Sequence, residues 1–206
     1  ANLHHEAASG RSELVGDVMV DMAMAAQPRA RERDDLVAAR GLTPGHYVLA
    51  TAHRAGNVDD PARLRSLVAL LTSMPLPVLL PLHPRTEARL RTTGLLEALR
   101  DAAGVTLIEP VGYFEMTALL CQAQAVLTDS GGLQKEAYLA GVRCVTMRPS
   151  TEWTETIETG WNVLVDLDAE AARAALEEEV PAVHPALYGD GHAGPRVVEA
   201  LRLLEP

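Results

Sequence analysis

Short apolar runs alternate along the chain with stretches of helical character. Six runs have the composition of strands, at residues 47–51, 78–82, 105–109, 125–129, 144–147 and 162–165. They are continuously apolar, which is typical of strands buried on both faces of a parallel sheet. Strands separated by helices form βαβ units with right-handed crossovers. The pattern therefore predicts an α/β fold with a doubly wound parallel sheet, and we expect one domain over residues 1–206.

Several helices carry recognisable start signals. Asp60–Pro61 supplies an N-cap and a first-turn proline, and Asp168 precedes an alanine-rich helical stretch. We expect Thr86 to open another helix and Asp17 to precede a long one. After a glycine-rich loop, residues 194–206 are predicted to form a closing C-terminal helix.

The charge balance limits the classes of partner. The net charge of −10 argues against nucleic acid or an anionic membrane, because both favour basic surfaces. An anionic ligand held by backbone amides and a few cations stays compatible with it. We find no apolar run of the roughly 18 residues that span a bilayer and no leader peptide. Cys121 and Cys144 sit in apolar settings and are expected to be buried thiols, so we expect a cytoplasmic protein.

The fourth run is followed by a turn that suits an anion. Ser130, Gly131 and Gly132 come between the strand and a helix that ends at Gly141. Amides at a helix N-terminus favour a bound anion, so the turn could hold a phosphate with the serine hydroxyl as a further donor. Glu136, one turn along, could accept hydrogen bonds from a ribose diol. On the glycines alone, a tight turn with an N-cap serine is equally well supported.

Polar and aromatic residues follow other strands of the predicted sheet. They are His53 and Arg54 after the first run, His83 and Arg85 after the second, Tyr113 and Phe114 after the third, and Arg148 after the fifth. The carboxyl ends of parallel strands meet at one edge, so two histidines and three arginines are expected to form a cationic rim there. Arginine and protonated histidine neutralise phosphate groups. The rim therefore favours a phosphorylated ligand over an ordinary turn.

Other chemistries find little support in the sequence. His4–His5 lie in a polar leader, and no histidine, cysteine and aspartate cluster has metal-ligand spacing. Ser130 follows a strand but lacks the G-x-S-x-G elbow of a nucleophile, and a Walker lysine is missing. Neither a metal nor another cofactor is expected.

Motifs in the same order as in a known family run along nearly the whole chain, from Asn2 to Leu201. The sequence closely resembles the non-hydrolysing UDP-N-acetylglucosamine 2-epimerases. The resemblance is carried by "TAHRAGNVDDPARL", "LPLHPRT", "VGYFEM", "TDSGGLQKEA", "RPSTEWTETIETG" and "YGDGHAGPRVVEAL". It implies the C-terminal half of a two-domain, GT-B-like enzyme with two Rossmann-like halves. Residues 1–13 would then be a linker from the N-terminal half, leading into the first strand and helix of this one.

The resemblance also implies a reaction. Those enzymes interconvert UDP-GlcNAc and UDP-ManNAc by eliminating UDP to give 2-acetamidoglucal and then re-adding it. They serve the synthesis of cell-envelope polysaccharides, and their C-terminal half holds the UDP. The ligands implied for this chain are therefore UDP and a UDP-N-acetylhexosamine.

The family's functional residues map onto the strand ends of this sequence. By resemblance, His53 is the catalytic histidine near the leaving phosphate. Ser130, Gly131 and Gly132 would hold the diphosphate, and Glu136 the ribose. The remaining implied UDP-binding residues are Tyr113 and Phe114, which would flank the uracil, and Arg54, His83 and Arg148, which would complete the polar rim.

Two departures from the family pattern affect what we expect. The family commonly reads H-R-x-E-N after the first strand, whereas here Gly56 replaces the acid. That loop helps the bacterial enzymes bind an allosteric UDP-GlcNAc, so this regulation is in doubt. The family's catalytic carboxylates belong to the N-terminal half, and a sugar C2 proton needs a base within reach. We therefore expect this chain alone to bind UDP weakly with little or no turnover.

Two alternatives to an epimerase half stay open. One is a non-catalytic UDP-sugar-binding module that regulates another chain. The other is a UDP-sugar glycosyltransferase domain, which the "SGGLQKEA" string disfavours. Apolar faces that meet the other half in the family would be exposed here, which promotes association. We therefore expect either a homodimer or pairing with an N-terminal half.

Overall fold

The computed structural model describes residues 12–202. The chain divides into two compact units, one made of residues 25–185 and the other of the residues before and after them. Almost all of the expected linker, residues 1–13, lies outside the described residues. None of the helices in the described part is long and apolar enough to cross a membrane.

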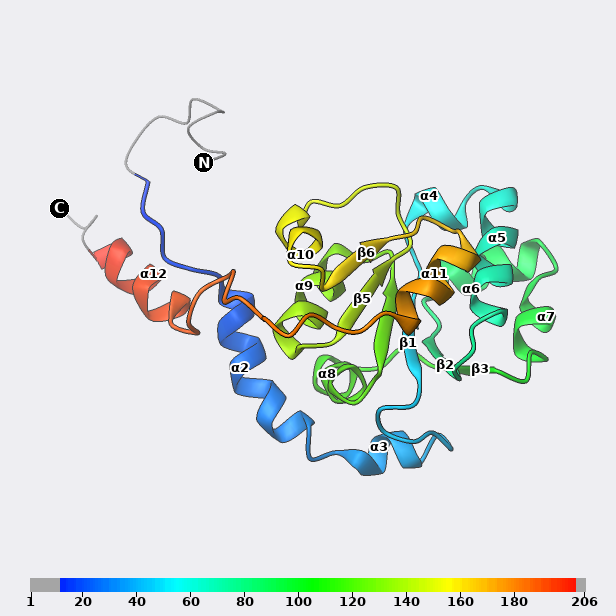
Figure 1. Ribbon diagram of the computed structural model, residues 1–206, viewed down its shortest axis with the longest axis horizontal. Helices are drawn as coiled ribbons and strands as arrows, with labels where there is room; N and C mark the ends of the chain where they lie inside the picture. Colours follow the sequence, from blue (N-terminus) through cyan, green and yellow to red (C-terminus); the bar gives the residue numbers. More distant parts are fainter. Residues whose placement is uncertain (1–11, 203–206) are drawn as a thin grey trace. The chain divides into compact units, whose positions relative to one another are not determined.

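The larger unit contains a parallel sheet of six strands (Figure 1). Their bounds are β1 Val48–Thr51, β2 Val78–Pro81, β3 Val105–Ile108, β4 Ala125–Thr128, β5 Arg143–Thr146 and β6 Asn162–Leu164. Each lies within about one residue of the run predicted from its apolar composition, a margin usual for strand ends. The prediction of a doubly wound, Rossmann-like parallel sheet is confirmed.

The strand order places β1 and β4 next to each other at the centre. The order is β3-β2-β1-β4-β5-β6, and Ala50 and Thr51 are in register with Leu127 and Thr128. Successive strands run outward from β1 in one direction and from β4 in the other. In an open α/β sheet, the crevice beyond the carboxyl ends at such a reversal is where ligands bind.

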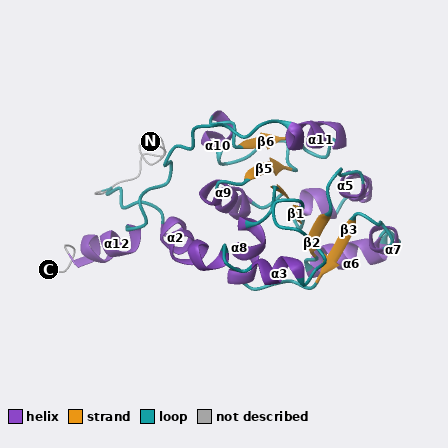
Figure 2. Cartoon of the chain, turned by 60° about the horizontal axis from the view of Figure 1, so that its bottom comes forward, coloured by secondary structure: helices purple, strands orange, loops and turns teal. Residues whose placement is uncertain are grey.

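Helices cover both faces of the sheet (Figure 2). Successive residues of a strand point to opposite faces. Val48 and Ala50 accordingly pack in one core cluster and Leu49 in the other. The first cluster also contains residues of α5 (Pro61–Thr72), α6 (Pro84–Thr92), α7 (Leu96–Arg100) and α11 (Ala169–Glu177). The second contains residues of α3 (Asp34–Ala38), α8 (Tyr113–Cys121) and α9 (Gly131–Ala140).

Of the three helix starts predicted within the larger unit, two are confirmed and one is wrong. The side chains of Asp60 and Asp168 each accept two backbone N–H bonds at the starts of α5 and α11. Thr86 does not open a helix, because α6 begins two residues earlier at Pro84. The hydroxyl of Thr86 is buried and donates to the backbone carbonyl of Ala52, the residue after β1, at 2.5 Å. The predicted helix also breaks at Gly94, whose φ of 72° is left-handed, so α6 and α7 are separate.

The smaller unit contains the start of α2 (Val18–Ala30) and α12 (Ala193–Arg202). Asp21 of α2 accepts the N–H groups at the start of α12, from Ala193 at 3.0 Å and Gly194 at 2.7 Å. The long N-terminal helix and the closing helix were both predicted, and the last four residues of the predicted closing helix lie outside the described part. Residues 12–17 form no strand, so the first strand implied by the resemblance is absent from them.

Candidate functional site

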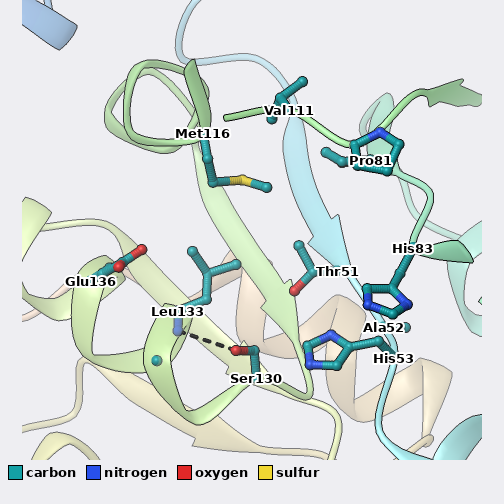
Figure 3. Close-up of a pocket in the computed structure, with 12 residues that line it drawn as sticks. Thr51, Ala52, His53, Pro81, His83, Val111, Met116, Ser130, Leu133 and Glu136 are labelled. Carbon is teal, nitrogen blue, oxygen red and sulfur yellow. Dashed lines mark hydrogen bonds between the residues drawn. The ribbon is translucent and has the colours of Figure 1, made fainter. Parts of the chain in front are cut away.

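A pocket of about 340 Å³ opens at the carboxyl ends of β1 and β4, where the strand order reverses (Figure 3). One part of its wall is polar and the other apolar. The polar part consists of Thr51, His53, His83, Ser130 and Glu136, and the rest of Ala52, Pro81, Pro110, Val111, Met116, Gly132 and Leu133. Pockets that combine an apolar wall with a few converging polar groups are typical of small-molecule sites.

The N-terminus of α9 forms one side of the pocket. Ser130 is its N-cap, and the serine hydroxyl accepts the N–H of Leu133 over a long 3.5 Å (Figure 3). The N–H of Ser130 itself donates to the hydroxyl of Thr128 at 2.9 Å. The first turn of α9 contains no acidic residue. Free amides and the helix dipole therefore favour an anion at this end.

The two glycines after Ser130 lie in different surroundings. Gly132 is exposed and lines the pocket. Gly131 is buried, and a Cβ there would lie 3.4 Å from Nε1 of Trp153 and 3.5 Å from Nη2 of Arg54. The indole of Trp153 donates to the Gly131 carbonyl at 2.8 Å. Gly131 is therefore packed against the connection between β5 and α10 (Thr154–Glu158), while the Cα of Gly132 faces the ligand space.

Two histidines from neighbouring strand ends lie together at the pocket (Figure 3). The rings of His53 and His83 stack with their centroids 5.2 Å apart and an interplanar angle of 27°. His83 is the N-cap of α6, and its Nδ1 accepts the N–H of Arg85 at 3.1 Å. An Nδ1 that accepts leaves the proton of the neutral ring on Nε2. The geometry thus supplies two imidazoles to one side of the ligand space.

A buried carboxylate beneath His53 was not among the residues predicted for the site. Asp129 is fully buried, and its oxygens accept the backbone N–H groups of His53 and Arg54 at 2.9–3.1 Å. Asn57 also donates its side-chain amide to Asp129 at 3.3 Å. The sequence signal was available: an acid at the end of an apolar run cannot be buried without donors.

Glu136 lines the pocket from α9 and is half-buried. Burial raises the pKa of its carboxyl, because the charged form loses hydration. Burial also raises the pKa of the Tyr113 hydroxyl, and the charge of Glu136 adds to that rise. The acid is therefore placed to accept hydrogen bonds from hydroxyl groups of a ligand.

The aromatic pair expected beside the ligand lies at the surface. Tyr113 and Phe114 begin α8 and are 42% and 37% exposed. Neither is part of the pocket wall, to which the same segment contributes Val111 and Met116. Both apolar residues belong to the "VGYFEM" string. The prediction named the two aromatic residues of that string as ligand contacts and did not include the valine or the methionine.

Two of the three arginines expected in the rim have side-chain partners outside the pocket wall. Arg148 makes two hydrogen bonds of 2.9 Å to Glu152. These bonds, helped by the charge of Arg54, lower the pKa of Glu152 to about 2. Arg85 contacts Asp59. Of the predicted rim, the structure brings the two histidines to the pocket and places the three arginines around it.

Within residues 12–202, no group of three or more histidine, cysteine, aspartate and glutamate side chains is arranged to hold a metal ion. Cys121 and Cys144 are free thiols, and Cys144 is buried as expected, whereas Cys121 is only partly buried. Burial raises the pKa of the Cys144 thiol to about 12, so it is an unreactive core residue. His4–His5 lie outside the described residues.

Comparisons of the sequence with family models and with known proteins point to the same family. The sequence model of the UDP-N-acetylglucosamine 2-epimerase family matches residues 2–202. A UDP-2,3-diacetamido-2,3-dideoxy-D-glucuronate 2-epimerase of Pseudomonas aeruginosa is 45% identical over 92% of this chain and 52% of its own length. A UDP-N-acetylglucosamine 2-epimerase homolog of Methanococcus maripaludis is 36% identical over 98% of this chain and 58% of its own length. The chain thus spans somewhat more than half the length of these relatives.

Solved structures agree with the sequence comparison. The Methanocaldococcus jannaschii UDP-GlcNAc 2-epimerase, in complex with UDP-GlcNAc and UDP, superposes with a TM-score of 0.87 at 33% identity. The match covers 98% of this chain and 58% of that one, in its C-terminal half. The Neisseria meningitidis enzyme shares the fold with a TM-score of 0.79 at 24% identity.

Proposed function

Because the chain belongs to the UDP-N-acetylglucosamine 2-epimerase family, we propose that it is the nucleotide-binding half of a UDP-sugar 2-epimerase. The whole chain would act as one functional domain that holds the UDP. The N-terminal half of such an enzyme would supply the carboxylates that move the C2 proton. In this proposal the chain alone binds UDP and turns over little or no substrate.

The observation that carries the proposal is the geometry at the strand reversal. The N-terminal amides of α9 and the imidazole of His53 line one pocket from β4 and β1. A pyrophosphate there would accept hydrogen bonds from the amides of Gly131 and Gly132 and from the Ser130 hydroxyl. Glu136 would bind the ribose diol, and the wall at Met116 would contact the base.

The reaction we propose is an elimination followed by an addition. The bond between the sugar C1 and the UDP oxygen breaks, the C2 proton goes to a base of the other half, and 2-acetamidoglucal results. UDP then adds back after the proton returns to the opposite face. His53 would donate to the departing phosphate oxygen and receive the proton back in the reverse step. His83 would support it by stacking, while Arg54 and Arg148 would contribute positive potential around the site.

The sugar is the point at which two candidates differ. The P. aeruginosa relative, at 45% identity, is a UDP-2,3-diacetamido-2,3-dideoxy-D-glucuronate 2-epimerase, whereas the two archaeal relatives are UDP-GlcNAc 2-epimerases or homologs. Both substrates carry UDP, which this chain would hold. The Pseudomonas match therefore favours the diacetamido sugar as a second candidate. We propose a cytoplasmic place for either reaction, because nucleotide sugars are made there.

Loss of the C2 proton in D₂O tests whether this chain only binds UDP and leaves proton transfer to the N-terminal half. Each UDP-sugar is incubated with the purified chain, and exchange of the C2 proton for deuterium is followed by ¹H NMR. We expect no exchange from the chain alone and full exchange from an intact M. jannaschii enzyme run in parallel on UDP-GlcNAc. Exchange by the chain at a rate near that of the intact enzyme would contradict the proposal. Glycosyl transfer to an added acceptor would instead support a transferase.

A further inference from the structure

Asp129 is a buried carboxylate whose partners come from the loop that carries His53. Its oxygens accept N–H bonds from His53, Arg54 and Asn57, and the side chain is fully buried. Burying a carboxylate is costly unless it is hydrogen-bonded and lies near a positive charge. Its position therefore joins the end of β4 to the loop after β1, across the strand reversal.

The imidazole of His53 also lies close to the carboxylate of Asp129. Nδ1 of His53 lies 3.6 Å from Oδ1 of Asp129, and the ring is 37% exposed, toward the pocket. The other ring partner is His83, which stacks on His53 (Figure 3). The charge of Asp129 also acts on the guanidinium of Arg148. A neighbour that accepts hydrogen bonds selects which nitrogen of an imidazole carries the proton.

We propose that Asp129 is a positioning residue for His53. Its carboxylate fixes the backbone of the loop and keeps a proton on Nδ1, so that Nε2 is left for the ligand in the pocket. In the charged ring Nε2 donates to an anionic oxygen, and in the neutral ring it accepts the proton back. The identity of that ligand rests on the proposed binding of UDP, whereas the geometry of Asp129 and His53 does not.

The protonation site of His53 can be measured without any ligand. Protein labelled with ¹⁵N-histidine is observed by long-range ¹H–¹⁵N correlation at pH 8.5, and the His53 signals are assigned from their absence in His53→Asn. We expect the shift pattern of a ring protonated on Nδ1. A pattern with the neutral ring protonated on Nε2 alone would overturn the proposal. The unmodified protein gives this answer, so it does not depend on the folding of a variant at Asp129.

A variant and a matched control separate the effect of the Asp129 charge on His53 from a general effect on folding. Asp129→Asn keeps an oxygen for the backbone N–H groups and removes the charge, so the proton of His53 is expected to move toward Nε2. Asp168→Asn is the control, because that carboxylate also accepts two backbone N–H bonds but caps α11. It should leave the His53 signals unchanged. An unaltered His53 pattern in folded Asp129→Asn would also overturn the proposal.

Titration with UDP tests whether Asp129 acts through His53. We expect Asp129→Asn to weaken binding at least about tenfold, the size of a lost charge-assisted hydrogen bond. In a His53→Asn background the same change should cost markedly less, since the positioned ring is gone. Equal losses in both backgrounds would show a merely structural role. If the unmodified chain fails to bind UDP, the proposed function falls, and the NMR measurement still decides the role of Asp129.

Discussion

The hydroxyl of Thr51 lies 2.7 Å from the hydroxyl of Thr128, so the last residues of β1 and β4 are joined by their side chains where the sheet reverses its strand order. Thr128 also accepts the N–H of Ser130. One hydrogen-bonded chain thus runs from β1 through β4 to the N-cap of α9. These hydrogen bonds link Thr51 and Ser130, which both line the pocket.

Thr128→Val should remove this chain and destabilise the fold. The residue is fully buried, so valine would leave the N–H of Ser130 and the hydroxyl of Thr51 without that partner. We expect a loss of about 1–3 kcal/mol in the free energy of unfolding. Urea unfolding followed by circular dichroism measures it. Thr51→Val, which leaves the Ser130 bond in place, is the control and should cost less. Equal losses would contradict the account.

The two glycines of the turn should respond differently to alanine. A Cβ on Gly131 or Gly132 meets ordinary contact distances, and neither residue has a left-handed φ, so both variants should fold. Only Gly132 faces the ligand space. We expect Gly132→Ala to weaken UDP binding by about tenfold or more through steric conflict, roughly 1.4 kcal/mol. Gly131→Ala should bind nearly as the unmodified chain, and a larger loss at Gly131 would contradict this placement.

Glu136→Gln should change how stability depends on pH. Burial raises the pKa of this carboxyl, so the folded state binds a proton more readily than the unfolded state. Stability should therefore fall as pH rises from the ordinary glutamate pKa through the raised one, and glutamine removes that fall. Unfolding of both proteins at pH 4.5 and 7 should show the variant gaining relative stability at pH 7. Exposed Glu170→Gln is the control. A constant difference between the two pH values would contradict the assignment.

Arg143→Leu should loosen the segment at residues 178–185. The guanidinium of Arg143 is buried and donates to the carbonyls of Gly160 and Glu179 at 3.3 and 2.7 Å. Leucine would leave these carbonyls without that donor. Hydrogen–deuterium exchange read by mass spectrometry should be faster in residues 178–185 and unchanged in β1. The partly exposed Arg173→Leu serves as the control, and equal protection in both variants would exclude the role of Arg143.

The sequence predicted the strands well and the helix ends less well. Continuous apolar runs mark strands buried on both faces, and burial of β1 and β4 agrees with that reading. The error at Thr86 arose because a threonine resembles an N-cap, whereas His83 caps α6 and Pro84 begins it. Histidine is a rare cap, so local propensity pointed to the wrong residue. The hydrogen bond of Thr86 to Ala52, the residue after β1, is a tertiary contact that could not be predicted from one sequence.

The sequence predicted which strand ends form the candidate site, but it did not predict the side-chain contacts there. The strand order brings His53, His83 and Ser130 to one pocket, as expected from a parallel sheet. The ion pair of Arg148 with Glu152 depends on the path of the β5–α10 connection, which has no periodic signal. The sequence showed Asp129 as an acid at the end of an apolar run, but its hydrogen-bond partners lie more than 70 residues away and could not be identified from the sequence.

Calorimetric titration of the chain with UDP tests the central claim most directly. We expect one UDP per chain, with binding weakened by about 1.5–3 kcal/mol in Glu136→Gln and in Ser130→Gly, which keeps most of the helix-capping stability while removing the hydroxyl. The remote variant Arg173→Leu should bind as the unmodified chain. An absence of binding heat at millimolar UDP, or equal affinity in all three variants, would contradict a pyrophosphate site at the reversal of the strands.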